Sequence, residues 1–440
     1  MFLKYIKRKK KLILILSIIF SIPLTINLAF NLFAEKKLKE DVKFWVNDNI
    51  NYKVDIITNI LTREKNYLNR YYNDYNEEFL PETQTNDLDF SLKKLNFIRY
   101  FQLEFLKKNP YGNDLLSFFI EILDEDNLLI IDSRANTYVV KNLEEKDIFE
   151  KEDVIKIKNN LVVERVLDTF LHEGKLFISF ETDDSMKKDN NCKRYNLSQA
   201  SFDLKSLDFK SFFHDKTCQK LINSGRMQFY EFQNKKGLLF AVSGALYDNP
   251  TNEPQDDSSM FGKILFKELK KDNVEIFSKG HRLILGLLVH NGIILSTENG
   301  PRGGDEINKI SYKGNYGWPI ASYGRRYDAD YEDNSLSYKN NHIINGFIEP
   351  IFSFIPSIGI SEIINIPNDF LENWVNNFLI SSLNKRSIFR IKFNNDYSKI
   401  IFNEEIYIGK RIRDIKYLKN KKKILLALED RAEIGILMDK

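Results

Sequence analysis

Six short apolar runs recur along the C-terminal three quarters of the chain. Each follows a turn-forming position, ends in a small or acidic residue and is rich in the aliphatic and β-branched residues typical of strands. The six runs are Asn127–Asp132, Lys175–Ser179, Gly237–Ala241, Gly292–Ser296, Asn377–Ser381 and Lys423–Ala427. Their spacing of roughly 46 to 85 residues fits one propeller blade plus insertions.

Further strands are expected shortly after most of these runs, at Thr137–Val140, Lys263–Phe266, Lys309–Tyr312, Ile388–Phe393 and Glu433–Met438. We therefore predict an all-β fold, a six-bladed β-propeller over residues 111–440. One large β-sandwich, or two of them, is the alternative, but it would not explain so regular a recurrence.

A different period governs the chain before the propeller. Residues 35–76 contain no glycine or proline, and apolar residues recur there in steps of three and four, as in a helix. We expect a helical stalk over residues 35–80, then a linker with the first strands over residues 81–110. The apolar stripe of the stalk could form a coiled coil that makes the protein oligomeric, or it could pack on the propeller.

The N-terminus carries a membrane signal. Basic residues at positions 4–11 precede the uncharged, mostly apolar run Leu12–Phe33, which is long enough to cross a bilayer. The basic residues favour the cytoplasmic side, so we expect residues 1–34 to be a signal anchor in the inner membrane and the propeller to lie in the periplasm or outside the cell. A cleaved signal peptide, with a poor cleavage site at Leu32-Phe33-Ala34, is the alternative.

Composition adds few constraints. The 440 residues are 43% hydrophobic and 29% charged, which is typical of a folded protein with a large core. The net charge of +3 is concentrated at the N-terminus, so no nucleic-acid partner is expected. Cys192 and Cys218 could form a disulfide or remain two free thiols, and they lack the spacing of a metal site.

The stretch Thr297–Pro319 is the most distinctive part of the sequence. It contains five glycines and two prolines, so we expect a rigid, irregular loop. Such a loop could offer carbonyl oxygens and the carboxylates of Glu298, Asp305 and Glu306 to a hard cation such as Ca²⁺. A tightly turned surface loop with solvated acids is the simpler interpretation.

A second charged segment, Gly409–Asp414, carries Arg411 and Arg413 on either side of Ile412. Alternation along a strand would place both guanidinium groups on one face, where they could bind an anionic ligand with planar carboxylates. A solvated edge with Asp414 as the partner is the other possibility.

Several motifs resemble, in the same order, those of the glucose/sorbosone dehydrogenase family, which includes soluble quinoprotein glucose dehydrogenases and aldose sugar dehydrogenases. The matching segments run from about Tyr111 to the C-terminus. They are Gly280–Arg282, Thr297–Asn308, Asn315–Pro319, Pro356–Ile363, Ser381–Ile391 and Arg411–Asp414.

The resemblance implies a six-bladed propeller that holds pyrroloquinoline quinone (PQQ) and Ca²⁺ and oxidises an aldose sugar or polyol. It implies that the Gly300 and Pro301 carbonyls, or Glu306 with the Tyr316 carbonyl, bind calcium. It also implies that the quinone is contacted by Arg282, Tyr327, Arg411 and Arg413.

Three positions depart from the family pattern. Ile222 stands where the family has its catalytic histidine, Leu283 replaces an asparagine, and Asn384 replaces a lysine. Isoleucine cannot accept a proton, so the catalytic residue is unknown. Two hypotheses remain: a PQQ- and calcium-dependent oxidoreductase with a changed base, or a non-catalytic calcium-binding propeller that binds a ligand or protein partner at the cell envelope.

Overall fold

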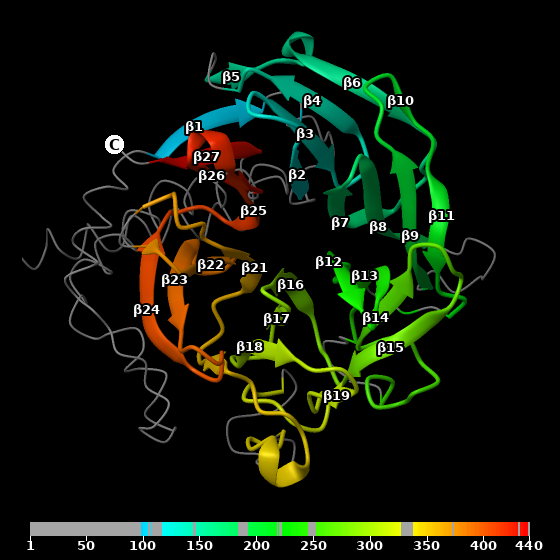
Figure 1. The fold of residues 1–440 in the computed structure, drawn as a ribbon, viewed down its shortest axis with the longest axis vertical. Coiled ribbons are helices and arrows are strands. Elements are labelled where there is room, and N and C mark those ends of the chain that lie inside the picture. Colours follow the sequence, from blue (N-terminus) through cyan, green and yellow to red (C-terminus); the bar gives the residue numbers. More distant parts are fainter. Residues whose placement is uncertain are drawn as a thin grey trace, which may run out of the picture. The chain divides into compact units, whose positions relative to one another are not determined.

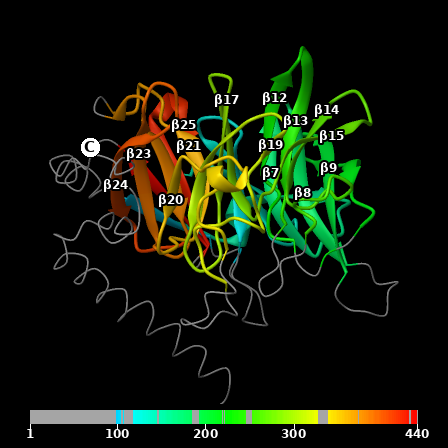
Figure 2. The same cartoon turned by 90° about the horizontal axis from the view of Figure 1, so that it is seen from below.

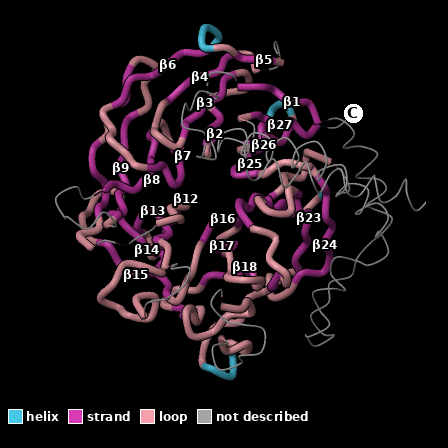
Figure 3. Tube along the Cα trace, turned by 180° about the vertical axis from the view of Figure 1, so that it is seen from behind, coloured by secondary structure: helices cyan, strands magenta, loops and turns pink. Residues whose placement is uncertain are grey.

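Six sheets are arranged around a central axis in the described part of this computed structural model (Figures 1, 2 and 3). The structure describes residues 98–103, 106, 117–143, 147–183, 192–217, 219, 222–244, 252–326, 338–371, 374–429 and 432–438. The predicted anchor and stalk, as well as Tyr327 and Cys218, lie outside these residues. No helix among the described residues has the length and apolarity needed to span a membrane.

The first three sheets are built as follows, from the central axis outward. The first contains β2 (Phe118–Ile122), β3 (Asn127–Asp132), β4 (Thr137–Lys141), β6 (Val154–Asn159) and β10 (Ser206–Leu207). The second contains β7 (Arg165–His172), β8 (Lys175–Asp183), β9 (Lys193–Ser201) and β11 (Lys210–His214). The third contains β12 (Met227–Phe232), β13 (Lys235–Val242), β14 (Lys263–Glu268), β15 (Val274–Lys279) and β19 (Gly314–Asn315).

The last three sheets follow the same plan. The fourth contains β16 (Ile284–His290), β17 (Ile293–Glu298), β18 (Asp305–Ile310) and β20 (Phe352–Phe354). The fifth contains β21 (Ile360–Asn365), β22 (Phe378–Ser382), β23 (Ser387–Phe393) and β24 (Ile400–Tyr407). The sixth contains β25 (Ile412–Leu418), β26 (Lys423–Leu428), β27 (Glu433–Met438), β1 (Ile98–Leu103) and β5 (Ile148–Phe149). Short 3₁₀ helices occur at η4 (Lys151–Asp153), η6 (Ile343–Asn345) and η8 (Lys419–Lys421).

The innermost strands close the ring. Each innermost strand contacts the innermost strand of the next blade, in the order β2, β7, β12, β16, β21 and β25. The last of these, β25, contacts β2. The sixth sheet joins both ends of the described chain, because β1 pairs antiparallel with β27 from Ile98↔Leu437 to Gln102↔Glu433. The sandwich alternative is therefore excluded, and the predicted six-bladed propeller is confirmed.

Each of the six recurrent runs falls in the second strand of one blade, namely β3, β8, β13, β17, β22 and β26. These strands are apolar without alternation because both of their faces are buried. In β17, Ile294 packs into the core shared with the third blade, while Leu295 packs into the core shared with the fifth blade. Buried apolar clusters fill all six gaps between neighbouring blades.

Two sequence predictions about strands need correction. The strand expected at Lys309–Tyr312 is β18, which lies at Asp305–Ile310. The stretch Thr297–Pro319 is also not wholly irregular, because β17 extends through Glu298 and β18 begins at Asp305. Polar residues occupy these strand ends. A search for apolar runs therefore does not identify these positions as parts of strands.

Cys192 is disulfide-bonded, and the chain contains one other cysteine, Cys218. The expected choice between a disulfide and a free thiol is thus decided for Cys192, whereas Cys218 lies outside the described residues.

Candidate functional site

Two carboxylates face each other where β17 and β18 meet. Glu298 and Glu306 are direct partners in the antiparallel register, so their side chains lie on the same face of the sheet. The two residues are almost fully buried, with 4% and 9% of their surface exposed. Like charges in this arrangement repel each other, and burial increases the cost of ionising both.

The turn between the two strands depends on glycine. Gly303 and Gly304 have positive φ angles of 85° and 69°, and a Cβ on Gly304 would lie 2.3 Å from the Gly324 nitrogen. Asp305 holds this turn: its carboxylate accepts hydrogen bonds from the backbone N–H groups of Gly300, Ile358 and Ile360, each at 2.9 Å. Asp305 therefore organises the loop, whereas we expected its carboxylate to be offered to a bound ion.

Glu298 is stabilised as an anion by its neighbours. His281 Nδ1 lies 2.8 Å from Glu298 Oε1, the Asn308 amide donates to the same oxygen at 3.0 Å, and the Arg282 backbone N–H donates to Oε2 at 3.2 Å. Burial alone would raise the pKa of Glu298, but His281 and these hydrogen bonds bring the pKa below its ordinary value.

Glu306 has the opposite environment. Burial, followed by repulsion from Glu298, raises the pKa of Glu306 well above its ordinary value, and one hydrogen bond from the Asn308 amide at 3.3 Å only partly opposes this. Glu306 therefore holds a proton more readily than an ordinary glutamate, and a bound cation would relieve the same repulsion.

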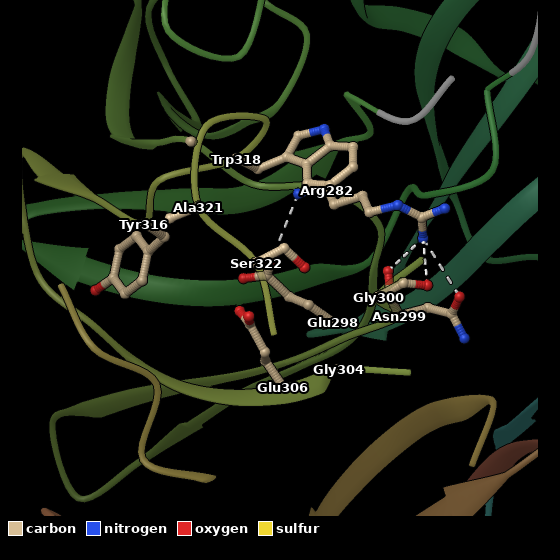
Figure 4. Close-up of a pocket in the computed structure, with 11 residues that line it drawn as sticks. Arg282, Glu298, Asn299, Gly300, Gly304, Glu306, Tyr316, Trp318, Ala321 and Ser322 are labelled. Atoms are coloured by element: carbon tan, nitrogen blue, oxygen red, sulfur yellow. Dashed lines mark hydrogen bonds between the residues drawn. The ribbon is translucent and has the colours of Figure 1, made fainter. Parts of the chain in front are cut away.

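A small pocket opens at this pair (Figure 4). It is lined by Gly280, Arg282, Glu298, Asn299, Gly300, Gly304, Glu306, Tyr316, Trp318, Ala321 and Ser322. Gly300, Glu306 and Tyr316, which the resemblance assigned to two alternative calcium sites, line this one pocket, while Pro301 is not part of the lining. Among the described residues, the free space of the pocket suits one ion or water.

The donors present fit a hard cation. Among the described residues, no three His, Cys, Asp or Glu side chains converge as a ready-made metal centre, so carbonyl and water oxygens would have to complete the shell. Two carboxylates with carbonyl oxygens are a ligand set that Ca²⁺ accepts. The Gly300 carbonyl also accepts a hydrogen bond from Arg282 Nη1 at 2.8 Å, so this oxygen is partly engaged.

The predicted quinone-binding arginines have other partners. Arg282 is buried over the Trp318 ring, 5.3 Å from its centroid. Arg411 Nε and Arg413 Nε donate to the two oxygens of Glu429 at 2.9 and 2.7 Å. The two arginines therefore share one face, as predicted, but their partner is Glu429 and not Asp414.

Glu429 was not among the residues expected from the sequence. It follows the recurrent run Lys423–Ala427 at the end of β26, and this position after the last apolar run is the signal that could have identified it. Glu429 is buried, yet Arg413 and Arg411 outweigh the effect of burial and hold the pKa of Glu429 below its ordinary value.

The position that the resemblance aligns with the family's histidine is closed. Ile222 is fully buried in the apolar core between the second and third blades, and its carbonyl accepts a hydrogen bond from Arg165 Nη2 at 2.6 Å. Leu283 packs with Leu285 and Leu383 in a separate apolar cluster. With the arginine pair partly neutralised by Glu429, the residues at the positions that the resemblance implies do not fit a quinone tricarboxylate served by a histidine base.

A network of charged residues on the innermost strands, here called the central belt, was also not predicted from the sequence. Arg226 Nη1 lies 2.8 Å from Asp168 and 2.6 Å from Glu362, while its Nε donates to the Leu285 carbonyl at 2.6 Å. Glu121, Asp414 and Lys416 extend this network across the innermost strands. Single charged residues within otherwise apolar strands are the sequence signal that could have indicated this network.

Comparison with known proteins places the chain in a family. The family model described as glucose/sorbosone dehydrogenase matches residues 117–437, well over half of the chain. An aldose sugar dehydrogenase of Escherichia coli, YliI, is 30% identical over 199 residues, which is 41% of this chain and 51% of that protein. Quinoprotein glucose dehydrogenase B of Acinetobacter calcoaceticus is 34% identical over 124 residues, 24% of each chain. The matched regions thus span about half or less of these relatives.

Solved structures confirm the fold. The apo form of the soluble aldose sugar dehydrogenase from Escherichia coli superposes with a TM-score of 0.58 at 19% identity, covering 77% of this chain and 99% of that one. The PQQ-bound aldose sugar dehydrogenase from Streptomyces coelicolor gives a TM-score of 0.51 at 15% identity, covering 73% and 98%. This chain belongs to the glucose/sorbosone dehydrogenase family and has an aldose sugar dehydrogenase-like β-propeller.

Proposed function

We propose that this protein is a calcium-binding propeller that binds a ligand or protein partner at the cell envelope without the family's sugar-oxidising chemistry. The observation that carries the proposal is the buried Glu298–Glu306 pair, two directly opposed carboxylates in a pocket of ion size. Ca²⁺ bound there would remove the repulsion between the carboxylates and tie β17 to β18.

The loss of catalysis is inferred from the base position. A general base must reach the proton that it removes, and Ile222 offers neither a proton acceptor nor an open site. Loss of a general base typically costs about 10² to 10⁴ in rate. The Glu429 carboxylate also leaves Arg411 and Arg413 with one net positive charge for a ligand, where the unpaired arginines would offer two.

A PQQ- and calcium-dependent oxidoreductase acting on an aldose or polyol is the second candidate. Arg411 and Arg413 do share one face, as a carboxylate-binding site requires. The relatives named above include aldose sugar and quinoprotein glucose dehydrogenases.

We place the propeller outside the cytoplasm, held by Leu12–Phe33 as an inner-membrane anchor. The basic residues before that run and the disulfide at Cys192 support this location, because disulfides persist in oxidising compartments.

One experiment separates the two candidates. The full chain, purified in detergent, is given Ca²⁺ and then PQQ, and both quinone binding and aldose-dependent reduction of an artificial electron acceptor are measured. We expect no quinone-dependent turnover. Turnover that is lost in Arg413→Ala but kept in the exposed-site control His214→Gln would overturn our proposal in favour of the oxidoreductase.

A further inference from the structure

Three buried side chains are hydrogen-bonded in series from the third blade to Glu298. Ser278 lies in β15, His281 follows the end of that strand, and Glu298 ends β17 in the fourth blade. Ser278 Oγ lies 2.7 Å from His281 Nε2, and His281 Nδ1 lies 2.8 Å from Glu298 Oε1. Ser278 is fully buried, so its hydroxyl is not accessible as a nucleophile and the series has to serve another purpose.

The imidazole of His281 is held in one orientation. The Tyr316 ring stacks on it, with centroids 4.7 Å apart and an angle of 25° between the ring planes. Tyr316 is itself fixed, because its hydroxyl donates to a backbone carbonyl of β18 at 2.6 Å. The His281 backbone N–H donates to the Gly262 carbonyl at 3.1 Å. The two ring nitrogens are therefore kept directed at Ser278 and Glu298.

The hydrogen bonds determine which ring nitrogen of His281 carries the proton. The Glu298 carboxylate can only accept, so Nδ1 is the donor in that contact. The Ser278 hydroxyl has no other hydrogen-bond partner among the described residues. If Nε2 also carried a proton, the hydroxyl hydrogen would be buried without an acceptor, which is costly. The hydroxyl therefore donates to Nε2, and His281 is neutral with its proton on Nδ1.

The two oxygens of Glu298 are used unequally. Oε1 accepts from three donors, namely His281 Nδ1, the Asn308 amide at 3.0 Å and the Ser296 hydroxyl at 3.2 Å. Among the described residues, Oε2 accepts one hydrogen bond, from the Arg282 backbone N–H at 3.2 Å. A carboxylate has roughly four acceptor positions in all. Oε1 is therefore saturated, and the remaining capacity of Glu298 lies on Oε2.

We infer that Ser278 and His281 are positioning residues for the cation site. Through the Nδ1–H group of a neutral His281 they fix Oε1 of Glu298, so that Oε2 is the oxygen offered to the ion. Metal-binding carboxylates are commonly held by hydrogen bonds of this kind, and loss of such a partner typically costs roughly 10- to 100-fold in metal affinity. This inference rests on the proposed calcium site and adds how one of its ligands is oriented.

Nitrogen NMR of the chelator-stripped full chain, labelled with ¹⁵N only at its five histidines, tests the hydrogen bonds without a bound ion. We expect His281, identified by the loss of its signals in His281→Leu, to have a protonated Nδ1 and an unprotonated Nε2. In Ser278→Ala the Nε2 signal should move to higher frequency, because this nitrogen loses its hydrogen-bond donor. Ser296→Ala is the matched control: this buried serine donates to Glu298 and not to His281, so the His281 signals should stay in place.

A protonated Nε2 in the wild type, or an Nε2 signal that does not move in Ser278→Ala, would overturn the inference. Both results leave the calcium proposal untouched, because neither spectrum involves the ion. If His281→Leu does not fold, comparison of the wild type with Ser278→Ala still reports the contact between Ser278 and His281.

Ca²⁺ titrations of wild type, His281→Leu and His281→Asn test the consequence for binding. Asparagine carries its amide nitrogen near the position of Nδ1 and can still donate to Glu298, whereas leucine cannot. We expect the affinity for Ca²⁺ to fall at least about tenfold in His281→Leu and to recover in part in His281→Asn. If His281→Leu binds Ca²⁺ as tightly as the wild type, or if the two variants are equally weak, the inference is overturned and the calcium proposal stands. If the wild type binds no Ca²⁺, both proposals fail.

Discussion

Glu298 and Glu306 stand directly opposite each other on β17 and β18, buried and joined through a single Asn308 amide that donates to both. The arrangement is asymmetric. His281 holds Glu298 in its ionised form, while the pKa of Glu306 is raised by burial and by Glu298 itself. We regard this pair as the centre of the functional site.

The turn that brings the two glutamates together should not tolerate a side chain. Gly304→Ala would place a Cβ 2.3 Å from the Gly324 nitrogen at a φ of 69°. We expect a loss of about 2 to 4 kcal/mol in the free energy of unfolding, from backbone strain and overpacking together. Gly346→Ala is the matched control, because its φ is 82° but no atom lies within 4 Å. Urea denaturation showing equal losses for the two variants would contradict the role of close packing here.

The shared carboxylate of Glu429 should stabilise the two arginines. Glu429→Gln removes the charge that Arg411 and Arg413 both contact, and these arginine side chains are only 24% and 17% exposed. We expect the free energy of unfolding to fall by about 1 to 3 kcal/mol. Asp126→Asn, which breaks the more exposed pair with Lys421, should cost less than about 1 kcal/mol in the same assay. A Glu429→Gln variant as stable as wild type would show that the arginines do not depend on this partner.

The central belt should make stability depend on pH. Burial raises the pKa of Glu121 to about 7, so the folded state binds a proton there more tightly than the unfolded chain does. This contribution is fully present below the unfolded pKa of about 4.5 and is lost as the pH rises through about 7.

Glu121→Gln cannot titrate, so its free energy of unfolding should fall less than that of the wild type between pH 5 and 8. The difference is on the order of 3 kcal/mol at most. Parallel pH profiles for the two proteins, measured by urea denaturation, would rule out Glu121 as a source of this dependence.

The sequence predicted the propeller because its signal is repeated six times. Runs such as Gly292–Ser296 are buried on both faces, so their apolar character persists whatever their neighbours are. The start of β18 escaped prediction because Asp305 and Glu306 are polar residues in a strand, which local propensity disfavours and tertiary contacts override.

The site could be predicted only in part. Short-range motifs singled out Gly300, Glu306 and Tyr316 as candidate calcium ligands in two alternative sites, and the three residues line one pocket in the structure. The pairing of Arg411 and Arg413 with Glu429, and the approach of His342 to Glu306, join residues that are 16 to 36 positions apart in sequence. Contacts of this kind depend on how the strands and loops are arranged in space, so no local pattern indicates them.

Calorimetric titration of Ca²⁺ into the chelator-stripped full chain tests the central claim most directly, with wild type, Glu306→Gln and the exposed-site control Glu173→Gln compared side by side. We predict that the wild type and Glu173→Gln bind Ca²⁺ alike, and that Glu306→Gln binds it at least about tenfold more weakly. Unchanged Ca²⁺ affinity in Glu306→Gln, or no Ca²⁺ binding by the wild type, would contradict the assignment of the Glu298–Glu306 pair as a calcium site.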